Sequence, residues 1–377
     1  MNKKIGSIFK GDKVIWMVFF FLCMISVVEV FSASSGLTYK SQNYVGPIAY
    51  HTGTIIAGVV VAIITLNIPC RYFKLMTPFL LLITGLMLIV VMLGGGKSTN
   101  DASRWISIMG LTIQPSEIAK GTIVLAVAQI LSAMQRENGA DRQAFKWILW
   151  ITVPTCLAIG VENLSTAALL FTVVFLMMFI GRVPMSQMGK LAGIIAVAAA
   201  AFLVLVLTLG SFEEKRSEDN HLTEVVSAEG EESVDKDAIK GGGVFHRFAT
   251  WRNRILKHFN SEEVPAEEYK IDDNFQVGHA NIAIASSGIS GKGPGNSTER
   301  DYLPQAFSDF IYAIIIEEMG ILGAAFVVFL YIVLLYRAAR IASRCENNFP
   351  AFLIMGLALL LVIQATFNMM VAVGLAP

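Results

Sequence analysis

The chain has 377 residues, of which 55% are hydrophobic and 15% are charged. Its 29 basic and 29 acidic side chains give a net charge of zero. This composition is typical of an integral membrane protein and excludes a soluble globular domain, and the balanced charge gives no reason to expect a nucleic-acid partner. The four cysteines lie in or beside apolar stretches and lack metal-ligand spacing, so we expect no structural disulfide.

Apolar stretches follow one another along most of the chain. A membrane-spanning helix needs about 20 mostly apolar residues. By that rule nine spans are predicted, at 14–32, 47–67, 75–94, 115–134, 147–162, 164–181, 191–210, 308–336 and 350–372. The first follows basic residues, as a signal peptide would, but it lacks a small-residue cleavage pattern, which favours an uncleaved helix. The sequence therefore predicts an all-α polytopic membrane protein, with seven spans in 1–210 and two in 308–377.

Lysine and arginine gather in every second loop. They precede the first span and follow the second, fourth, sixth and eighth, at Lys3, Lys4, Lys10, Lys13, Arg71, Lys74, Arg136, Arg142, Lys146, Arg182, Lys190, Arg337, Arg340 and Arg344. Because positively charged loops stay in the cytoplasm, the N-terminus is expected there. The loop at 95–114 and the long loop at 211–307 then face the outside.

The long outer loop has three parts. Residues 211–240 are acidic and short of large apolar groups, so we expect a disordered insertion. Residues 244–260 mix aromatic and basic side chains at helical spacing, which indicates an amphipathic helix, either on the membrane surface or packed on the protein's outer face. Residues 275–295 begin as an apolar half-span, too short to cross a bilayer, and end in a run of glycines.

The glycine-rich segment and the start of the eighth span form the first candidate site. Irregular backbone beside a membrane must contact protein or water, because lipid cannot satisfy its polar groups. Asp309, at the mouth of the span, is a candidate functional acid, although an aspartate there could instead cap the helix. Glu317 and Glu318 lie inside the span, so at least one of them must face a polar interior, a partner or a cation.

The second candidate site lies at the start of the fourth span. Pro115 suits the first helical turn, where Glu117 is favoured by the helix dipole and can pair with Lys120. Arg104 and Trp105 precede this helix in the outer loop, where tryptophan anchors at the interface and arginine can bind phosphate. A capped helix with interface anchors would explain the same residues without any function.

These segments resemble the signature of the SEDS family (shape, elongation, division and sporulation proteins). The similar residues are Arg104-Trp105 with Gln114-Pro-Ser116-Glu117-x-Ala-Lys120, the run from Ile282 to Ser297, Tyr302-Leu-Pro304, and the run from Ser308-Asp309 to Glu317-Glu318-Met-Gly320. The resemblance covers nearly the whole chain, with the spans in the same order. Gly295-Asn296-Ser297 before Tyr-Leu-Pro is more similar to the division members of the family than to its elongation members.

The resemblance implies a peptidoglycan glycosyltransferase of the bacterial cytoplasmic membrane, which polymerises lipid II on the outer side. It implies a class B penicillin-binding protein and other division-site membrane proteins as partners. Asp309 matches the family's essential outer-loop aspartate and would be the catalytic general base. The residues expected to bind substrate are Arg104, Trp105, Gln114, Ser116, Glu117, Lys120, Lys292 and Asn296, with Glu317 and Glu318 in support.

The leaving diphosphate of such a reaction needs positive charge. Arg104, Lys292 or a bound divalent cation, Mg²⁺ or Mn²⁺, would supply it, and no organic cofactor is expected. Residues 162–166 (Glu-Asn-Leu-Ser-Thr) form either a tight turn with polar tips or part of a polar cavity. The family usually has Pro-Asp-x-Gly-Thr there, so Asn163 weakens any role of that position as a cation ligand.

The resemblance also leaves alternatives open. The family's pattern continues into a tenth span, whereas this chain stops at Pro377, so the resemblance predicts that the last span is missing. A missing span and an acidic loop would suit a non-enzymatic scaffold that recruits a partner synthase. Many spans with buried acids would suit a lipid II flippase. Substitution of Asp309 separates a polymerase from a scaffold, and transport across vesicles identifies a flippase.

Overall fold

The computed structural model describes residues 10–33, 46–93, 97–99, 102–108, 111–137, 139–227, 275–303, 306 and 308–375. Its long helices are α2 (Lys13–Ala33), α4 (Gly46–Leu66), α5 (Cys70–Met92), α6 (Pro115–Ala133), α7 (Arg142–Glu162), α8 (Leu164–Ile180), α9 (Met185–Ser227), α12 (Ile311–Ala342) and α13 (Asn348–Ala372). Within the described residues, eight of them are long and apolar enough to cross a membrane, and the 17-residue α8 is shorter. The predicted all-α membrane fold is confirmed, and each predicted span corresponds to one of these helices.

The chain divides into two units, residues 1–184 with 270–376, and residues 185–269 with 377. α9 is the described helix of the second unit and continues to Ser227. The expectation of disorder over 211–240 is therefore wrong for 211–227. Residues that follow an existing helix need no new nucleus, and the Glu, Lys and Arg of this stretch are good helix formers. The predicted amphipathic segment at 244–260 lies outside the described residues.

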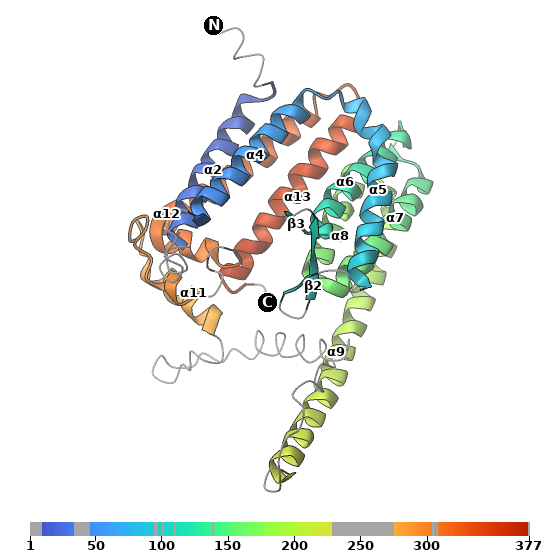
Figure 1. Ribbon diagram of the computed structural model, residues 1–377. Helices are drawn as coiled ribbons and strands as arrows, with labels where there is room; N and C mark the ends of the chain where they lie inside the picture. The colour runs from blue at the N-terminus through green and yellow to red at the C-terminus, as the bar shows by residue number, and fades with distance from the viewer. Residues whose placement is uncertain are drawn as a thin grey trace. The chain divides into compact units, whose positions relative to one another are not determined.

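The first unit is built around α13. This helix packs against α12, α6 and α8, while α2 and the short helix α11 (Phe275–Ser286) pack on α12 (Figure 1). In α6, 61% of the residues in its apolar 18-residue stretch are buried, whereas in the corresponding stretch of α4 none is. α4 still presents Ile56, Val60 and Val61 outward. Such a face is stable against lipid rather than water, so α4 lies at the lipid-facing edge.

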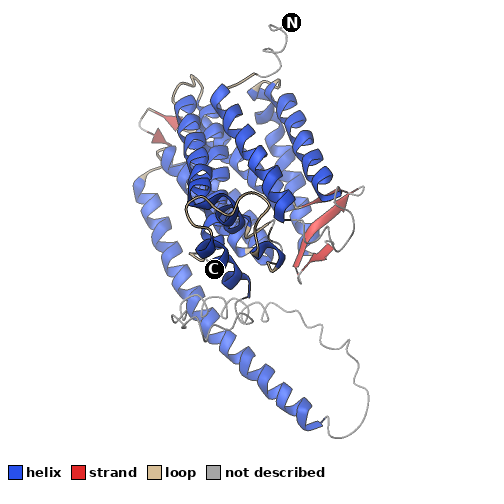
Figure 2. Cartoon of the chain, turned by 90° about the vertical axis from the view of Figure 1, so that its left-hand side faces the viewer, coloured by secondary structure: helices blue, strands red, loops and turns tan. Residues whose placement is uncertain are grey.

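Short strands lie at both ends of this unit. β1 (Lys97–Thr99), β2 (Ala102–Ile108) and β3 (Leu111–Ile113) form an antiparallel sheet in that order, at the same end as α11 (Figure 1). β4 (Gln135–Arg136) and β5 (Gly139–Ala140) pair at the opposite end (Figure 2). The sequence predicts only a loop over 95–114, because strands this short carry almost no periodic signal.

An ion pair joins α2 to α12 at the end away from α11. Asp12 accepts hydrogen bonds from the N–H groups of Val14 and Ile15, at 2.9 and 3.2 Å, and so caps α2. The Arg337 guanidinium donates to the same carboxylate, with Nη2 at 2.7 Å and Nε at 2.9 Å from Oδ2. This hydrogen bond holds the pKa of Asp12 below its usual value.

We expect Asp12→Asn to lower the free energy of unfolding at neutral pH by about 1–2 kcal/mol, because the charge-assisted bond is lost. Since the folded-state pKa is the lower one, the native stabilisation is full above the ordinary value of about 3.9 and disappears as the pH falls through the folded pKa. Thermal unfolding midpoints in detergent should therefore differ at pH 7 and converge in acid. Glu137→Gln, at an exposed acid, is the control; a difference that persists in acid would contradict the pairing.

Candidate functional site

α12 is broken near its N-terminal end. At Gly320, φ is 71° and ψ is −176°, which are not helical values. In an unbroken helix, the N–H groups of Ile321 and Leu322 would donate to the carbonyls of Glu317 and Glu318. The break leaves these four backbone groups in need of other partners, because lipid offers none.

Residues 287–298, here called the glycine loop, supply those partners. The N–H groups that follow the break donate to the carbonyls of Gly288 and Ile289, at 3.5 and 3.4 Å. The two glutamate carbonyls accept from the N–H groups of Lys292 and Gly293, at 2.9 and 2.8 Å. The helix and the loop therefore satisfy each other's backbone.

Two glycines make this close approach feasible. A Cβ on Gly291, where φ is 75°, would lie 2.2 Å from the carbonyl oxygen of Glu318. A Cβ on Gly320 would lie 2.3 Å from the carbonyl oxygen of Ile289. Any other residue would meet this overlap together with the strain of a positive φ. Close packing of backbone on backbone thus explains why glycine is needed at both positions.

The carboxylate of Glu317 is fully buried and is enclosed by the glycine loop. Lys292 Nζ lies 2.6 Å from Oε1, and Thr298 donates to the same oxygen from its N–H at 3.1 Å and its hydroxyl at 2.9 Å. The Ser297 hydroxyl donates to Oε2. Lys292 was expected to bind substrate, and the structure places its ammonium group on Glu317. Asn296, from the same expectation, is exposed and donates to the Lys292 carbonyl oxygen at 3.1 Å.

The carboxylate of Glu318, also fully buried, ties the glycine loop to α2. The N–H groups of Gly295 and Ser297 donate to it at 2.8 and 3.3 Å, and the Ser32 hydroxyl of α2 donates to Oε1. Arg300 Nη1 lies 3.9 Å from Oε1 and donates to the Ser32 hydroxyl oxygen at 2.8 Å. Both glutamates thus face a polar interior made of protein groups, as the sequence predicted for at least one of them.

Asp309 lies on the turn before α12, and its side chain is exposed. The cap position of α12 is Phe310, and no side chain caps the helix, so the capping alternative is wrong. Within the described residues, no hydrogen bond or ion pair engages the Asp309 carboxylate. The surrounding backbone is anchored, because Leu303, Ala306 and Phe310 are buried in one apolar cluster with Ala280 of α11.

A buried pair that no sequence pattern predicts lies beside this segment. His279 of α11 and Glu299 of the 3₁₀ helix η2 (Glu299–Asp301) are 7% and 9% exposed, and His279 Nδ1 lies 2.5 Å from Glu299 Oε2. The imidazole stacks on the ring of Tyr302, with centroids 5.2 Å apart and planes 3° apart. The partners are far apart in the sequence and follow no motif, so nothing in the sequence pointed to them.

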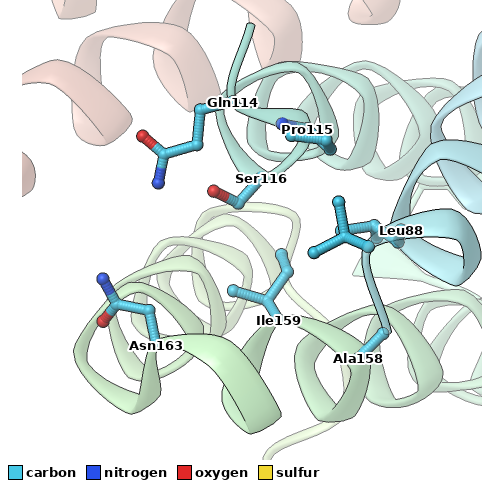
Figure 3. A pocket seen from close by; sticks show the side chains of 8 residues that line it. Leu88, Gln114, Pro115, Ser116, Ala158, Ile159 and Asn163 are labelled. Atoms are coloured by element: carbon cyan, nitrogen blue, oxygen red, sulfur yellow. The ribbon is translucent and has the colours of Figure 1, made fainter. Parts of the chain in front are cut away.

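Gln114 and Ser116 line a small pocket at the start of α6. Its remaining walls are Leu88, Val91, Pro115, Ala158, Ile159 and Asn163. Figure 3 shows the polar ends of Gln114, Ser116 and Asn163 on one side and Leu88 and Ala158 on the other. A volume of about 20 Å³ accommodates water rather than a sugar ring. Asn163 also caps α8, accepting from the Thr166 N–H at 3.1 Å, so the turn at 162–166 is both a cap and part of a cavity.

The predicted pair of Glu117 and Lys120 is confirmed, with 2.9 Å between Oε2 and Nζ. Lys120 is 3% exposed and also donates to Gln364 Oε1 of α13, at 2.9 Å, so it joins α6 to the central helix. Trp105 on β2 is 37% exposed. Arg104 lies on the same strand, and its side chain is outside the described part of the chain. Substrate binding by these four residues stays a prediction.

A metal site built from protein side chains is not found in the described ranges. There, no three His, Cys, Asp or Glu side chains are grouped so that they could hold a metal ion. The described acids at the break in α12 are occupied by hydrogen-bond donors of the glycine loop. The predicted divalent cation stays a prediction.

The fold defines a polytopic helical membrane protein with a broken helix and an exposed acid on the turn that leads into that helix. The family model described as cell cycle protein, which covers FtsW, RodA and SpoVE, matches residues 12–219 and 239–377, and the chain belongs to this family. A probable peptidoglycan glycosyltransferase FtsW of Geobacter metallireducens is 27% identical over 371 residues, which cover 97% of this chain and 86% of that protein. The peptidoglycan glycosyltransferase MrdB of Escherichia coli K12 is 24% identical over 368 residues, covering 97% and 85%.

Solved structures share the fold. A chain from a peptidoglycan synthase complex superposes with a TM-score of 0.65 at 19% identity and covers 96% of this chain and 88% of its own length. The crystal structure of the rod shape determining protein RodA of Thermus thermophilus gives a TM-score of 0.54 at 17% identity, covering 98% and 89%. The break in α12 and the glycine loop are therefore set in a fold that distant relatives also adopt.

We expect Gly291→Ala to lower the free energy of unfolding by about 2–4 kcal/mol, because the new Cβ overlaps the α12 backbone at a positive φ. Gly58→Ala in α4, where no atom lies within 4 Å, is the matched control and should stabilise by about 0.5–1 kcal/mol. Thermal unfolding in detergent measures both. Equal midpoints for the two variants would show that the loop and the helix do not approach as described.

Proposed function

We propose that this protein is a peptidoglycan glycosyltransferase that polymerises lipid II during cell division. The observation that carries the proposal is the exposed carboxylate of Asp309, held on the anchored segment that leads into α12. An acid that neither caps a helix nor pairs within the described structure is available to accept a proton from a substrate. Membership of a family whose curated relatives are named as peptidoglycan glycosyltransferases supports this function.

In the proposed reaction, Asp309 is the general base for a sugar hydroxyl of one lipid II molecule. The carboxylate takes the hydroxyl proton as the hydroxyl oxygen attacks the anomeric carbon of the other lipid-linked glycan. A glycosidic C–O bond forms, the bond from the anomeric carbon to the diphosphate oxygen breaks, and undecaprenyl pyrophosphate leaves. Positioned base catalysis of this kind contributes about 10²–10⁴-fold in rate.

The leaving diphosphate is stabilised by positive charge, and the structure bears on which residue provides it. Lys292 is already paired with Glu317 at 2.6 Å, so we assign it to holding the glycine loop. Arg104, on the sheet at the same end of the helices as α11, is then the proposed diphosphate contact (Figure 1). Its guanidinium suits bidentate binding of phosphate oxygens.

The proposed setting is the bacterial cytoplasmic membrane, with the N-terminus in the cytoplasm. The lysine and arginine distribution supports this orientation, which places α11, the sheet β1–β3 and Asp309 on the outer side. A class B penicillin-binding protein is the proposed partner, together with other division-site membrane proteins. The related chain solved within a peptidoglycan synthase complex supports an assembly of this kind.

We expect Asp309→Asn to lower polymerisation at least about 10²-fold, because the amide cannot accept the proton. The assay follows fluorescent lipid II on a gel, with the full chain and its cognate penicillin-binding protein, whose transpeptidase site is blocked. Asp301→Asn is the matched control, since it neutralises another exposed acid of the same outer segment, and it should still form long strands.

Each other result would contradict a different part of the proposal. Full polymerisation by Asp309→Asn would remove Asp309 from the reaction. If the native protein and Asp309→Asn both recruit the penicillin-binding protein but neither forms polymer, a scaffold is favoured. Transport of lipid II across vesicles without polymer would favour a flippase.

A further inference from the structure

One exposed aromatic side chain, Tyr302, packs on a buried pair of polar side chains. Tyr302 is 57% exposed, yet one face of its ring lies against the buried imidazole of His279, at 5.2 Å and 3°. The imidazole is held in turn by Glu299, whose Oε2 lies 2.5 Å from Nδ1. A ring backed by a buried hydrogen-bonded pair has a fixed plane.

The backbone that carries this ring is fixed as well. The N–H groups of Tyr302 and Leu303 both donate to the Glu299 carbonyl oxygen, at 3.1 and 3.0 Å. Leu303 is buried in the apolar cluster that also contains Phe310, the residue after Asp309. Tyr302 and Asp309 are therefore exposed residues near the two ends of one anchored segment.

A membrane-interface anchor is the simplest alternative for an exposed tyrosine in an outer loop. Such an anchor needs contact with lipid headgroups, but it does not need a fixed ring plane. Burying a histidine and a glutamate has a desolvation cost, and here the pair sets the plane of the Tyr302 ring. A fixed plane matters for a ligand that stacks on the ring.

We propose that Tyr302, held by His279 and Glu299, is a stacking platform for a pyranose ring of the lipid-linked sugar. The face of an aromatic ring is negative, and the C–H groups on one face of a pyranose carry partial positive charge, so the two surfaces stack. Because the ring is fixed beforehand, binding restricts few rotamers. This proposal rests on the function proposed above and adds a binding site for the sugar of the lipid that reacts at Asp309.

The test compares two ligands on the purified full chain. Lipid II carries the sugars, whereas undecaprenyl pyrophosphate has the same tail and diphosphate without them. We expect Tyr302→Leu to bind lipid II about five- to tenfold more weakly and undecaprenyl pyrophosphate as well as the native chain does. His279→Ala should show a smaller loss of the same selectivity, about two- to fivefold. Tyr302→Phe keeps the ring and should retain lipid II affinity, and Tyr336→Ala, at another exposed tyrosine, is the control.

A loss confined to lipid II supports the platform. No loss in Tyr302→Leu overturns it, and so does an equal loss for both ligands, which is what misfolding would produce. Binding is measured without polymerisation, so the two proposals fail separately. A native chain that forms no polymer but shows the selective loss would contradict the glycosyltransferase function alone. Polymer formation with unchanged lipid II affinity in Tyr302→Leu would contradict the platform alone.

Discussion

The exchange of backbone hydrogen bonds between the broken helix α12 and the glycine loop is the constraint on which the rest of the site depends. A break in a membrane helix leaves carbonyl and N–H groups without partners in a medium that offers no water. The loop supplies both kinds of partner, and it does so because Gly291 and Gly320 let the two backbones meet. The positions of the side chains between Lys292 and Tyr302 follow from this exchange.

Glu317 and Glu318 hold the glycine loop on α12 with their side chains as well as with their backbone carbonyls. Their carbonyls hold the middle of the glycine loop, while their buried carboxylates hold its end and reach Ser32 of α2. Buried ion pairs are weak evidence for stability, because desolvation offsets much of the attraction. We therefore interpret the acidic pair as selecting one conformation of the loop. The anchored segment that ends at Asp309 begins directly after that loop.

The parts of this structure that lipid dictates could be predicted from the sequence, and the parts that depend on contacts between distant residues could not. Apolar windows located the spans, and glycines after a half-span located the irregular loop, because a bilayer permits few alternatives. Hydropathy marks where the membrane ends rather than where a helix ends, so the extension of α9 to Ser227 was missed. Charge alone could not show that Lys292 is already paired with Glu317, and no motif linked His279 to Glu299.

The register of the backbone hydrogen bonds between 288–293 and 317–322 also limits where residues can be inserted or deleted. One residue inserted on either side would shift every donor relative to its acceptor and would bring a side chain to a place where only glycine fits. The connection between α12 and α13, at 343–347, is a helix end followed by a turn and has no such register. Insertions and deletions among related chains should therefore accumulate in connections of that kind and be absent from the glycine loop.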